Sequence, residues 1–295
     1  MRREGIVATF SIVGRDPKTG DLGVAVQSKF LGVGAVVPWA RAGVGAVATQ
    51  SYANTSYGPR GLALLSDGLE PQAVLAELTR DDPEVAQRQV GIVDAQGHSA
   101  SFTGAGCYAW AGGRTGQDFA CQGNILVNPA TVGDMADSFV AHPELPLWDR
   151  LLTALAAAQA AGGDRRGQQS AALLVVRENG GYAGFNDRFI DLRVDEHAHP
   201  IDELKRILEL HKLYLFKTNP TDLLPLTPDI ISEVQGILTR TGDYSGPASG
   251  EFAPDTLTAM NAYVSRENLE ERWPPDVTTP PGQIDRVVLD FMREH

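Results

Sequence analysis

The sequence predicts an α+β protein in which two β-sheets pack together between outer helices, followed by a small all-helical domain. Three observations lead to this fold class: strand-like and helix-like segments alternate in groups, the helices come in pairs, and neighbouring strands are joined by short turns. Such strands pair antiparallel, whereas a doubly wound parallel sheet needs a helix between successive strands. The order therefore favours a four-layer αββα sandwich.

The predicted strands are rich in β-branched and small apolar residues. The first two, residues 9–13 and 22–27, flank a turn that contains Pro17 and Gly20, so they form an antiparallel hairpin. Small residues on both faces of the later strands indicate that other layers cover them on both sides. These later strands are residues 33–38, 44–50, 88–94, 98–103, a strand that ends near Gln122, 170–176 and 188–194.

The predicted helices carry apolar residues at three- and four-residue spacing. Pro71 suits the first turn of a helix, and the segment 147–161 consists largely of Ala and Leu, which indicates burial. The helices of the larger domain are residues 61–66, 71–80, 132–141, 147–161 and 201–216.

A boundary between domains is predicted at residues 218–228. This polar stretch contains three prolines, which stop helices and favour an extended linker. The sequence therefore predicts one domain over residues 1–217 and a second over 229–295, with helices at 229–239 and 255–270.

The composition excludes several classes of partner. Of the 295 residues, 43% are hydrophobic and 21% are charged, which is typical of a globular protein. The net charge is -12 and no basic run occurs, so nucleic acid and anionic membranes are excluded. No apolar stretch approaches the length of a membrane span or resembles an export signal, so the expected location is the cytoplasm. Long apolar outer helices favour a homodimer.

Five stretches in the first 217 residues carry a resemblance to a known family. They are TFSIVGRDPKTGDLGVAVQSKFLGVGAVVPWARAGVGAVATQSYAN from Thr9, CYAWAGG from Cys107, CQGNIL from Cys121, GDRRGQQSAALLV from Gly163 and DRFIDLRVD from Asp187. Together they resemble a bacterial family of unknown function, domain-of-unknown-function family ten-twenty-eight. The resemblance implies a fold similar to that of N-terminal-nucleophile hydrolases and agrees with the αββα sandwich. It implies no particular substrate.

Thr9 stands at the head of the first strand, where such hydrolases keep their nucleophile. If the eight residues before it are removed, Thr9 gains an α-amine with a pKa of about 7.7–8.0. That amine can take the proton of the Thr9 hydroxyl as the oxygen attacks a carbonyl. Either the chain is cleaved after Ala8, or translation starts nearer Thr9, or Thr9 is an ordinary residue in a strand, where threonine is favoured.

Amides, hydroxyls and charges at nearby strand ends are candidates to stabilise an oxyanion and the charged amine. Lys29 either lowers the proton affinity of the amine or is a solvated charge, and Asn124 either supplies an amide or forms a turn. Asp187 and Arg188 either bind a substrate carboxylate or amine or form a structural ion pair. The catalytic candidates are Thr9, Lys29, Gln50 and Asn124, and the substrate-binding candidates are Ser28, Ser51, Asp187 and Arg188.

No motif predicts a cofactor or a metal. The glycines at 32–34 and 104–106 form only incomplete dinucleotide fingerprints, and no phosphate-binding loop is present. The acidic and histidine residues at 195–199 precede a helix, where they are more typical of a cap than of a metal site. Cys107 and Cys121 are expected to be small buried hydrophobes rather than a disulfide.

The second domain carries a shorter resemblance. Its segments VQGIL from Val234, GDYSG from Gly242 and TLTAMNAY from Thr256 resemble small helical peptidoglycan-binding domains. After residue 225 the chain has 12 Asp and Glu against 5 Lys and Arg, which disfavours the carboxylates of peptide stems. A cytoplasmic interaction or lid module is therefore favoured, and peptidoglycan fragments stay an alternative partner.

Two functions follow from these observations. The first is an amide-bond hydrolase in which Thr9 acts on a small amide or peptide-like substrate through an acyl-enzyme, without a cofactor. The second is a non-catalytic ligand-binding or assembly protein that keeps the sandwich fold.

Overall fold

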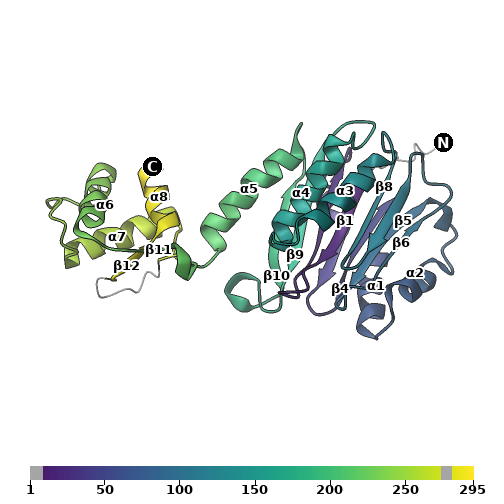
Figure 1. The fold of residues 1–295 in the computed structure, drawn as a ribbon, viewed down its shortest axis with the longest axis horizontal. Coiled ribbons are helices and arrows are strands. Elements are labelled where there is room, and N and C mark those ends of the chain that lie inside the picture. The colour runs from purple at the N-terminus through teal and green to yellow at the C-terminus, as the bar shows by residue number, and fades with distance from the viewer. Residues whose placement is uncertain (1–8, 274–280) are drawn as a thin grey trace. The chain divides into compact units, whose positions relative to one another are not determined.

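The structure is a computed structural model that describes residues 9–273 and 281–295. The chain forms two compact units, Met1–Ile207 and Leu208–His295 (Figure 1). The first unit contains both large sheets, and the second contains the carboxyl-terminal helices.

A six-stranded antiparallel sheet forms one layer of the first unit. Its order is β10-β9-β2-β1-β8-β7, so β1 lies between β2 and β8 in the middle of the sheet. Thr9 pairs with Ser28 of β2 on one side and with Asn124 of β8 on the other. The strands are β1 (Thr9–Arg15), β2 (Leu22–Ser28), β7 (Gly112–Gly116), β8 (Phe119–Asn124), β9 (Ser170–Val176) and β10 (Arg188–Val194).

A four-stranded antiparallel sheet with the order β3-β4-β5-β6 packs against the first sheet. Side chains of alternating residues from both sheets fill the space between them, including Val24, Ala48 and Val93. Its strands are β3 (Pro38–Arg41), β4 (Gly45–Ser51), β5 (Arg88–Asp94) and β6 (Ser99–Thr103).

Two pairs of helices cover the outer faces of the sheets. Helices α1 (Tyr57–Ser66) and α2 (Pro71–Thr79) pack on the four-stranded sheet, where Val47 and Val90 face them. Helices α3 (Ala130–Ala141) and α4 (Leu147–Ala160) pack on the six-stranded sheet, which Gly14 allows because a Cβ there would lie 3.0 Å from Leu151 and Phe139. The predicted mixture of helices with antiparallel sheets is confirmed.

The strand predicted at residues 33–38 is wrong. Val33–Ala35 forms a 3₁₀ turn, and β3 begins only at Pro38. Gly32 takes a left-handed conformation with φ of 64°, and the Ser170 hydroxyl accepts the Val33 amide at 3.1 Å. This long-range hydrogen bond replaces the strand pairing that the run of valines favours.

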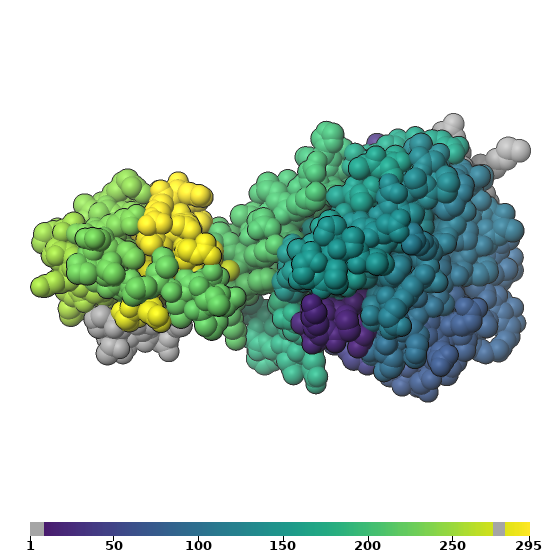
Figure 2. Space-filling model, viewed as in Figure 1, coloured from purple at the N-terminus to yellow at the C-terminus, as the bar shows by residue number. Residues whose placement is uncertain are grey.

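The first two strands are almost fully covered. β1 and β2 are buried along nearly their whole length, and only the turn at residues 17–20 between them is exposed. On the face drawn in Figure 2, the earliest described residues accordingly reach the surface only as a small purple patch.

The second unit is built around three helices: α6 (Pro228–Thr241), α7 (Pro254–Glu267) and α8 (Arg286–Glu294). Their core includes Val234, Met260 and Leu289. The unit also contains a small antiparallel pair, β11 (Leu223–Pro225) and β12 (Gln283–Asp285), so the prediction of an all-helical domain missed these strands. No helix of the described residues has the length and apolar character needed to cross a bilayer.

The segment predicted as a linker, residues 218–228, takes part in the second unit. It contains β11, and the Thr218 hydroxyl donates to the Asp285 carboxylate at 2.7 Å. The boundary between the units falls instead within α5 (Pro200–Leu215), whose Leu213 and Tyr214 pack on the carboxyl-terminal core.

Candidate functional site

Thr9 lies at the head of the central strand β1 and is fully buried. Its hydroxyl is 3.0 Å from the Ser28 hydroxyl, and Asn124 is its partner residue on β8. Thr9 and Ser11 share the face of β1 that looks toward the four-stranded sheet, because side chains alternate along a strand. The hydroxyl of Thr9 is therefore positioned between the two sheets.

Gln50 of β4 connects this end of β1 to the second sheet. Its Nε2 donates to the Thr9 carbonyl at 3.3 Å and to Gln89 Oε1 at 2.9 Å. Its Oε1 accepts the Ser11 hydroxyl at 2.6 Å. Gln50 was predicted from its place at a strand end, and the structure brings it to Thr9.

Two more glutamines extend these contacts. Gln89 Oε1 accepts Asn124 Nδ2 at 2.9 Å, and Gln89 Nε2 donates to the Gly123 carbonyl at 2.8 Å. Gln122 Nε2 donates to the Ser11 hydroxyl at 2.7 Å. All of these side chains are fully buried, and none of them carries a charge. We call this set the inter-sheet network: Thr9, Ser11, Ser28, Gln50, Gln89, Gln122 and Asn124.

Ser11, Gln89 and Gln122 were missed by the sequence reasoning. The available signal was a polar side chain next to an apolar run within a strand, since Gln89 directly precedes Val90 and Gln122 directly follows Cys121. Burial of an amide is unfavourable unless it is hydrogen-bonded, so such positions indicate polar partners across a sheet interface.

The inter-sheet network has two unsatisfied acceptors. Asn124 Oδ1 and Gln122 Oε1 are buried and have no hydrogen-bond partner among the described residues. A buried acceptor without a donor costs about 1–3 kcal/mol. Of the two, Asn124 Oδ1 belongs to the residue that pairs with Thr9, whereas Gln122 Oε1 lies against Gly91 of β5.

The strands beside Thr9 end in left-handed residues. Ile125, directly after Asn124, has φ of 53°, and Ser51, directly after Gln50, has φ of 67°. A β-branched residue rarely adopts this conformation, and such strain is often found at functional sites. Both residues turn the chain sharply at the end of the sandwich that holds Thr9.

Ser51 does not join the inter-sheet network. It follows Gln50 in β4, so its side chain points to the opposite face of the sheet. There it interacts with Cys107, whose thiol pKa is raised by burial and lowered in part by the hydrogen bond with Ser51. Cys107 and Cys121 are both free thiols.

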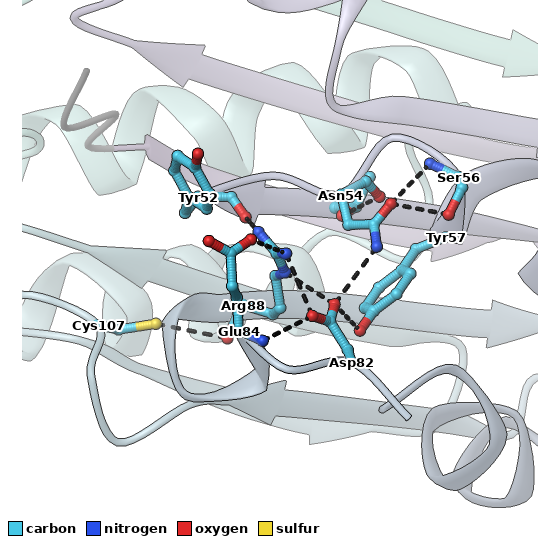
Figure 3. Close-up of polar contacts among 9 residues, drawn as sticks. Tyr52, Asn54, Ser56, Tyr57, Asp82, Glu84, Arg88 and Cys107 are labelled. Atoms are coloured by element: carbon cyan, nitrogen blue, oxygen red, sulfur yellow. Dashed lines mark hydrogen bonds and ion pairs between the residues drawn. The ribbon is translucent and has the colours of Figure 1, made fainter. Parts of the chain in front are cut away.

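A second polar cluster lies on the helix-covered face of the same sheet (Figure 3). Arg88 Nε is 2.9 Å from Asp82 Oδ2, and Arg88 Nη2 is 2.7 Å from Glu84. The Tyr57 hydroxyl donates to Asp82 Oδ2 at 2.6 Å. We call Tyr57, Asp82, Glu84 and Arg88 the ionic cluster. It borders a pocket of about 270 Å³ that Asn54 and Arg60 also line.

The protonation states of the ionic cluster follow from these contacts. The hydrogen bonds from Arg88 hold the pKa of the Asp82 carboxyl well below its usual range. Burial, together with the hydrogen bond to Asp82, raises the pKa of Tyr57. The pair Asp82–Arg88 is therefore charged at neutral pH, and each partner compensates the burial of the other.

Lys29 directly follows Ser28 at the end of β2, and it forms no hydrogen bond with the inter-sheet network in the described chain. Its side chain is exposed, and Nζ donates to the Gln168 carbonyl at 3.1 Å. Of the two alternatives for Lys29, an effect on the Thr9 amine or a solvated charge, the exposed side chain agrees with the second.

Asp187 and Arg188 lie at the other end of the sheet. Arg188 pairs with Val176, which pairs with Leu22, whereas Ser28 beside Thr9 is at the far end of β2. Six residues of strand separate the two ends by about 20 Å. Asp187 accepts the Ala42 amide at 2.9 Å, and Arg188 forms an ion pair with Asp191. The two residues therefore neither pair with each other nor border Thr9.

The acidic and histidine residues at 195–199 are the segment in which a metal site was weighed against a helix cap. Across the described ranges, no group of three or more His, Cys, Asp or Glu side chains is arranged to hold an ion. The His197 and His199 rings stand 6.4 Å apart, and the His197 amide donates to the Gln169 carbonyl.

The first unit is thus an α+β fold in which two antiparallel sheets pack together and a buried polar site lies at one end. Residues 9–204 match the family model described as "Family of unknown function (DUF1028)", and the chain belongs to this family. Residues 214–292 match the model described as "Putative peptidoglycan binding domain". Both resemblances expected from the sequence are thereby confirmed.

A solved structure supports the same assignment. The chain is similar to the crystal structure of protein SPO2555 from Silicibacter pomeroyi, a DUF1028 protein, with 33% identity and a TM-score of 0.64. The similarity covers 70% of this chain and 86% of that protein. Among curated proteins, none matches the chain.

Proposed function

We propose that the first unit is an amide-bond hydrolase whose nucleophile is the Thr9 hydroxyl. The observation that carries the proposal is the position of Thr9 at the head of the central strand, 3.0 Å from the Ser28 hydroxyl and paired with Asn124. Sheets that face each other between pairs of helices agree with the sandwich of N-terminal-nucleophile hydrolases. A free α-amine at Thr9 completes the catalyst.

The proposed reaction begins with removal of residues 1–8. Because Thr9 is fully buried in the intact chain, this cleavage is also the step expected to open the head of β1 to substrate. The new α-amine takes the hydroxyl proton while Oγ1 attacks the carbonyl carbon of the amide. Asn124 Oδ1 has no donor in the described chain, and we propose that it accepts a hydrogen bond from that amine.

The remaining steps regenerate the enzyme. The carbon–nitrogen bond of the substrate breaks, the leaving nitrogen takes the proton from the α-ammonium, and an ester to Thr9 remains. Water, deprotonated by the same amine, hydrolyses the ester and releases the acid. Stabilisation of the oxyanion requires an N–H or O–H donor, and we propose the Ser28 hydroxyl, 3.0 Å from the Thr9 hydroxyl, for this role.

The test compares Thr9→Ala and Thr9→Ser with the natural protein on a panel of small amides. We expect Thr9→Ala to lose hydrolysis and Thr9→Ser to retain part of it, because serine keeps the hydroxyl and the amine. Thermal melting checks that both variants fold. A Thr9→Ala protein as active as the natural one contradicts the proposal and leaves the ligand-binding alternative.

For the second unit we propose binding of peptidoglycan fragments. The match over residues 214–292, which spans nearly all of this unit, supports this function. The full chain is expected to sediment with purified peptidoglycan and not with chitin of equal mass. Equal amounts in both pellets, or none in either, contradict it.

A further inference from the structure

Residues 162–169 bridge the two strands that flank β1, and we call this segment the strap. On the β2 side, Asp164 Oδ2 accepts the Lys29 amide at 3.0 Å and the Gln169 amide donates to the Ser28 carbonyl at 3.1 Å. On the β8 side, the Arg165 amide donates to the Ile125 carbonyl at 3.0 Å. Since β1 lies between β2 and β8, the strap joins the strand ends on both sides of Thr9.

The strap brings positive charge to both flanks of Thr9. On the β8 side, Arg165 Nη2 donates to the Leu126 carbonyl at 3.1 Å. On the β2 side, Lys29 Nζ donates to the Gln168 carbonyl at 3.1 Å. Both side chains are exposed, and within the described parts of the chain neither forms an ion pair. A guanidinium has five N–H donors, so Arg165 can still bind a carboxylate.

The neighbouring charges do not cancel these two. Asp164, which is 4% exposed, is paired with Arg166 at 3.1 Å and so compensates that arginine. Asp195 and Glu196 follow β10, and the Asp195 carbonyl accepts the Gly32 amide at 3.0 Å, three residues after Lys29. Neither carboxylate forms an ion pair with Lys29 or Arg165 in the described chain. Lys29 and Arg165 are thus two cations without a salt-bridge partner in the described chain, at the ends of the strands that flank β1, in a protein whose net charge is -12.

We propose that the substrate of Thr9 is a small amide that carries a carboxylate, and that Arg165 and Lys29 bind this carboxylate from the two flanks of β1. The inference rests on the proposed hydrolase function and adds the class of its substrate. Neighbouring strands are about 4.8 Å apart, so both side chains reach a group held over the head of β1. A charged hydrogen bond of this kind is worth about 1.5–3 kcal/mol, or roughly tenfold or more in affinity.

The test uses two amides of similar size, glutaramate, which has a carboxylate, and pentanamide, which is neutral. Binding is measured by calorimetry and hydrolysis by ammonia release, on protein from the native host whose amino-terminal residue is shown to be Thr9. We expect glutaramate to be preferred by about tenfold or more, and Arg165→Gln and Lys29→Gln each to reduce that preference several-fold.

The chain offers matched controls. Lys18 is an exposed lysine that donates to the Pro143 carbonyl at 3.0 Å, and Arg41 is an exposed arginine that donates to the Leu62 carbonyl at 3.3 Å. Lys18 lies in the turn that follows β1, and Arg41 pairs with Gly45 at the start of β4. Both are at the end of their sheet that is far from Thr9. Lys18→Gln and Arg41→Gln remove the same charges and should leave the preference unchanged.

Each outcome decides between the two proposals. Three results overturn the carboxylate inference: equal binding and hydrolysis of the two amides, no binding of glutaramate, or an equal loss of preference in the control variants. If pentanamide is hydrolysed in that case, the hydrolase proposal still stands. The protein could instead bind glutaramate preferentially, through Arg165 and Lys29, but release no ammonia. That result supports the binding site and contradicts only the hydrolase function.

Discussion

The two faces of the four-stranded sheet carry polar clusters of opposite character at the same end. Gln89 and Arg88 are neighbours in β5, yet Gln89 enters the inter-sheet network and Arg88 enters the ionic cluster. The inter-sheet network contains only neutral amides and hydroxyls and has two unsatisfied acceptors. In the ionic cluster, Asp82 accepts hydrogen bonds from Arg88, Tyr57 and Asn54.

This difference is the reason why we propose a structural role for the ionic cluster and a functional role for the inter-sheet network. A buried ion pair such as Asp82–Arg88, in which each partner compensates the burial of the other, holds its segments together. A buried network with free acceptors is destabilising unless another group completes it. We therefore assign function to the inter-sheet side and stability to the helix-covered side, and the following variants test that division.

The largest effect on stability is expected for Arg88→Ala. The side chains of Arg88 and Asp82 are 7% and 5% exposed, so the substitution leaves a buried carboxylate without its cation. Removal of one partner of a buried pair costs about 3–5 kcal/mol. Urea unfolding measures this loss. A cost below about 1 kcal/mol would show that the cluster is not structural.

The second effect is a dependence on pH that Asp82→Asn should remove. The pKa of Asp82 is lowered in the folded protein, so its contribution to stability is present above the unfolded pKa of about 4 and is lost as the pH falls below it. At pH 7 the variant should be less stable by about 1–3 kcal/mol. The gap should narrow between pH 5 and pH 3, and a constant gap would contradict the assignment.

The third effect concerns the packing of the inter-sheet network. A Cβ at Gly91 would lie 1.9 Å from Gln122 Oε1, so Gly91→Ala must displace the Gln122 amide from Ser11. We expect a loss of about 1–3 kcal/mol in unfolding free energy. Gly133→Ala in α3 is the matched control, because a Cβ there meets nothing within 4 Å. Equal stability of the two variants would contradict tight packing around Gln122.

The smallest effect is expected for Arg80→Ala. Arg80 pairs with Glu77 one turn away in sequence, but its side chain is 60% exposed. Exposed pairs of this kind contribute about 0.2–1 kcal/mol or less. The comparison with Arg88→Ala therefore isolates the effect of burial. A cost as large as that of Arg88→Ala would remove the distinction.

Local sequence signals predicted the elements that depend on neighbouring residues. The first hairpin follows from its turn residues, and β5, β9 and β10 agree with the predicted strands. The strand at 33–38 was wrong because Ser170, which is far away in sequence, bonds the Val33 amide. The start of α1 at Tyr57 was also missed, since the fold buries Tyr57 and joins its hydroxyl to Asp82.

The candidate site was predicted only in part for a related reason. Thr9, Gln50 and Asn124 were found because each stands at a strand end. Gln89 and Gln122 lie within strands, and only the packing of the two sheets shows that both contact Gln50. Asp187 and Arg188 were grouped because they are adjacent in sequence, but adjacent residues near a strand end take separate partners.

The most direct test of the central claim is the amino-terminal sequence and intact mass of protein from its native host, measured on a preparation assayed for amide hydrolysis. The account predicts that the active chain begins at Thr9, so that the hydroxyl and the α-amine belong to one residue. Active protein that still begins at Met1 or Arg2 would contradict it, because Thr9 would then lack the amine that activates its oxygen.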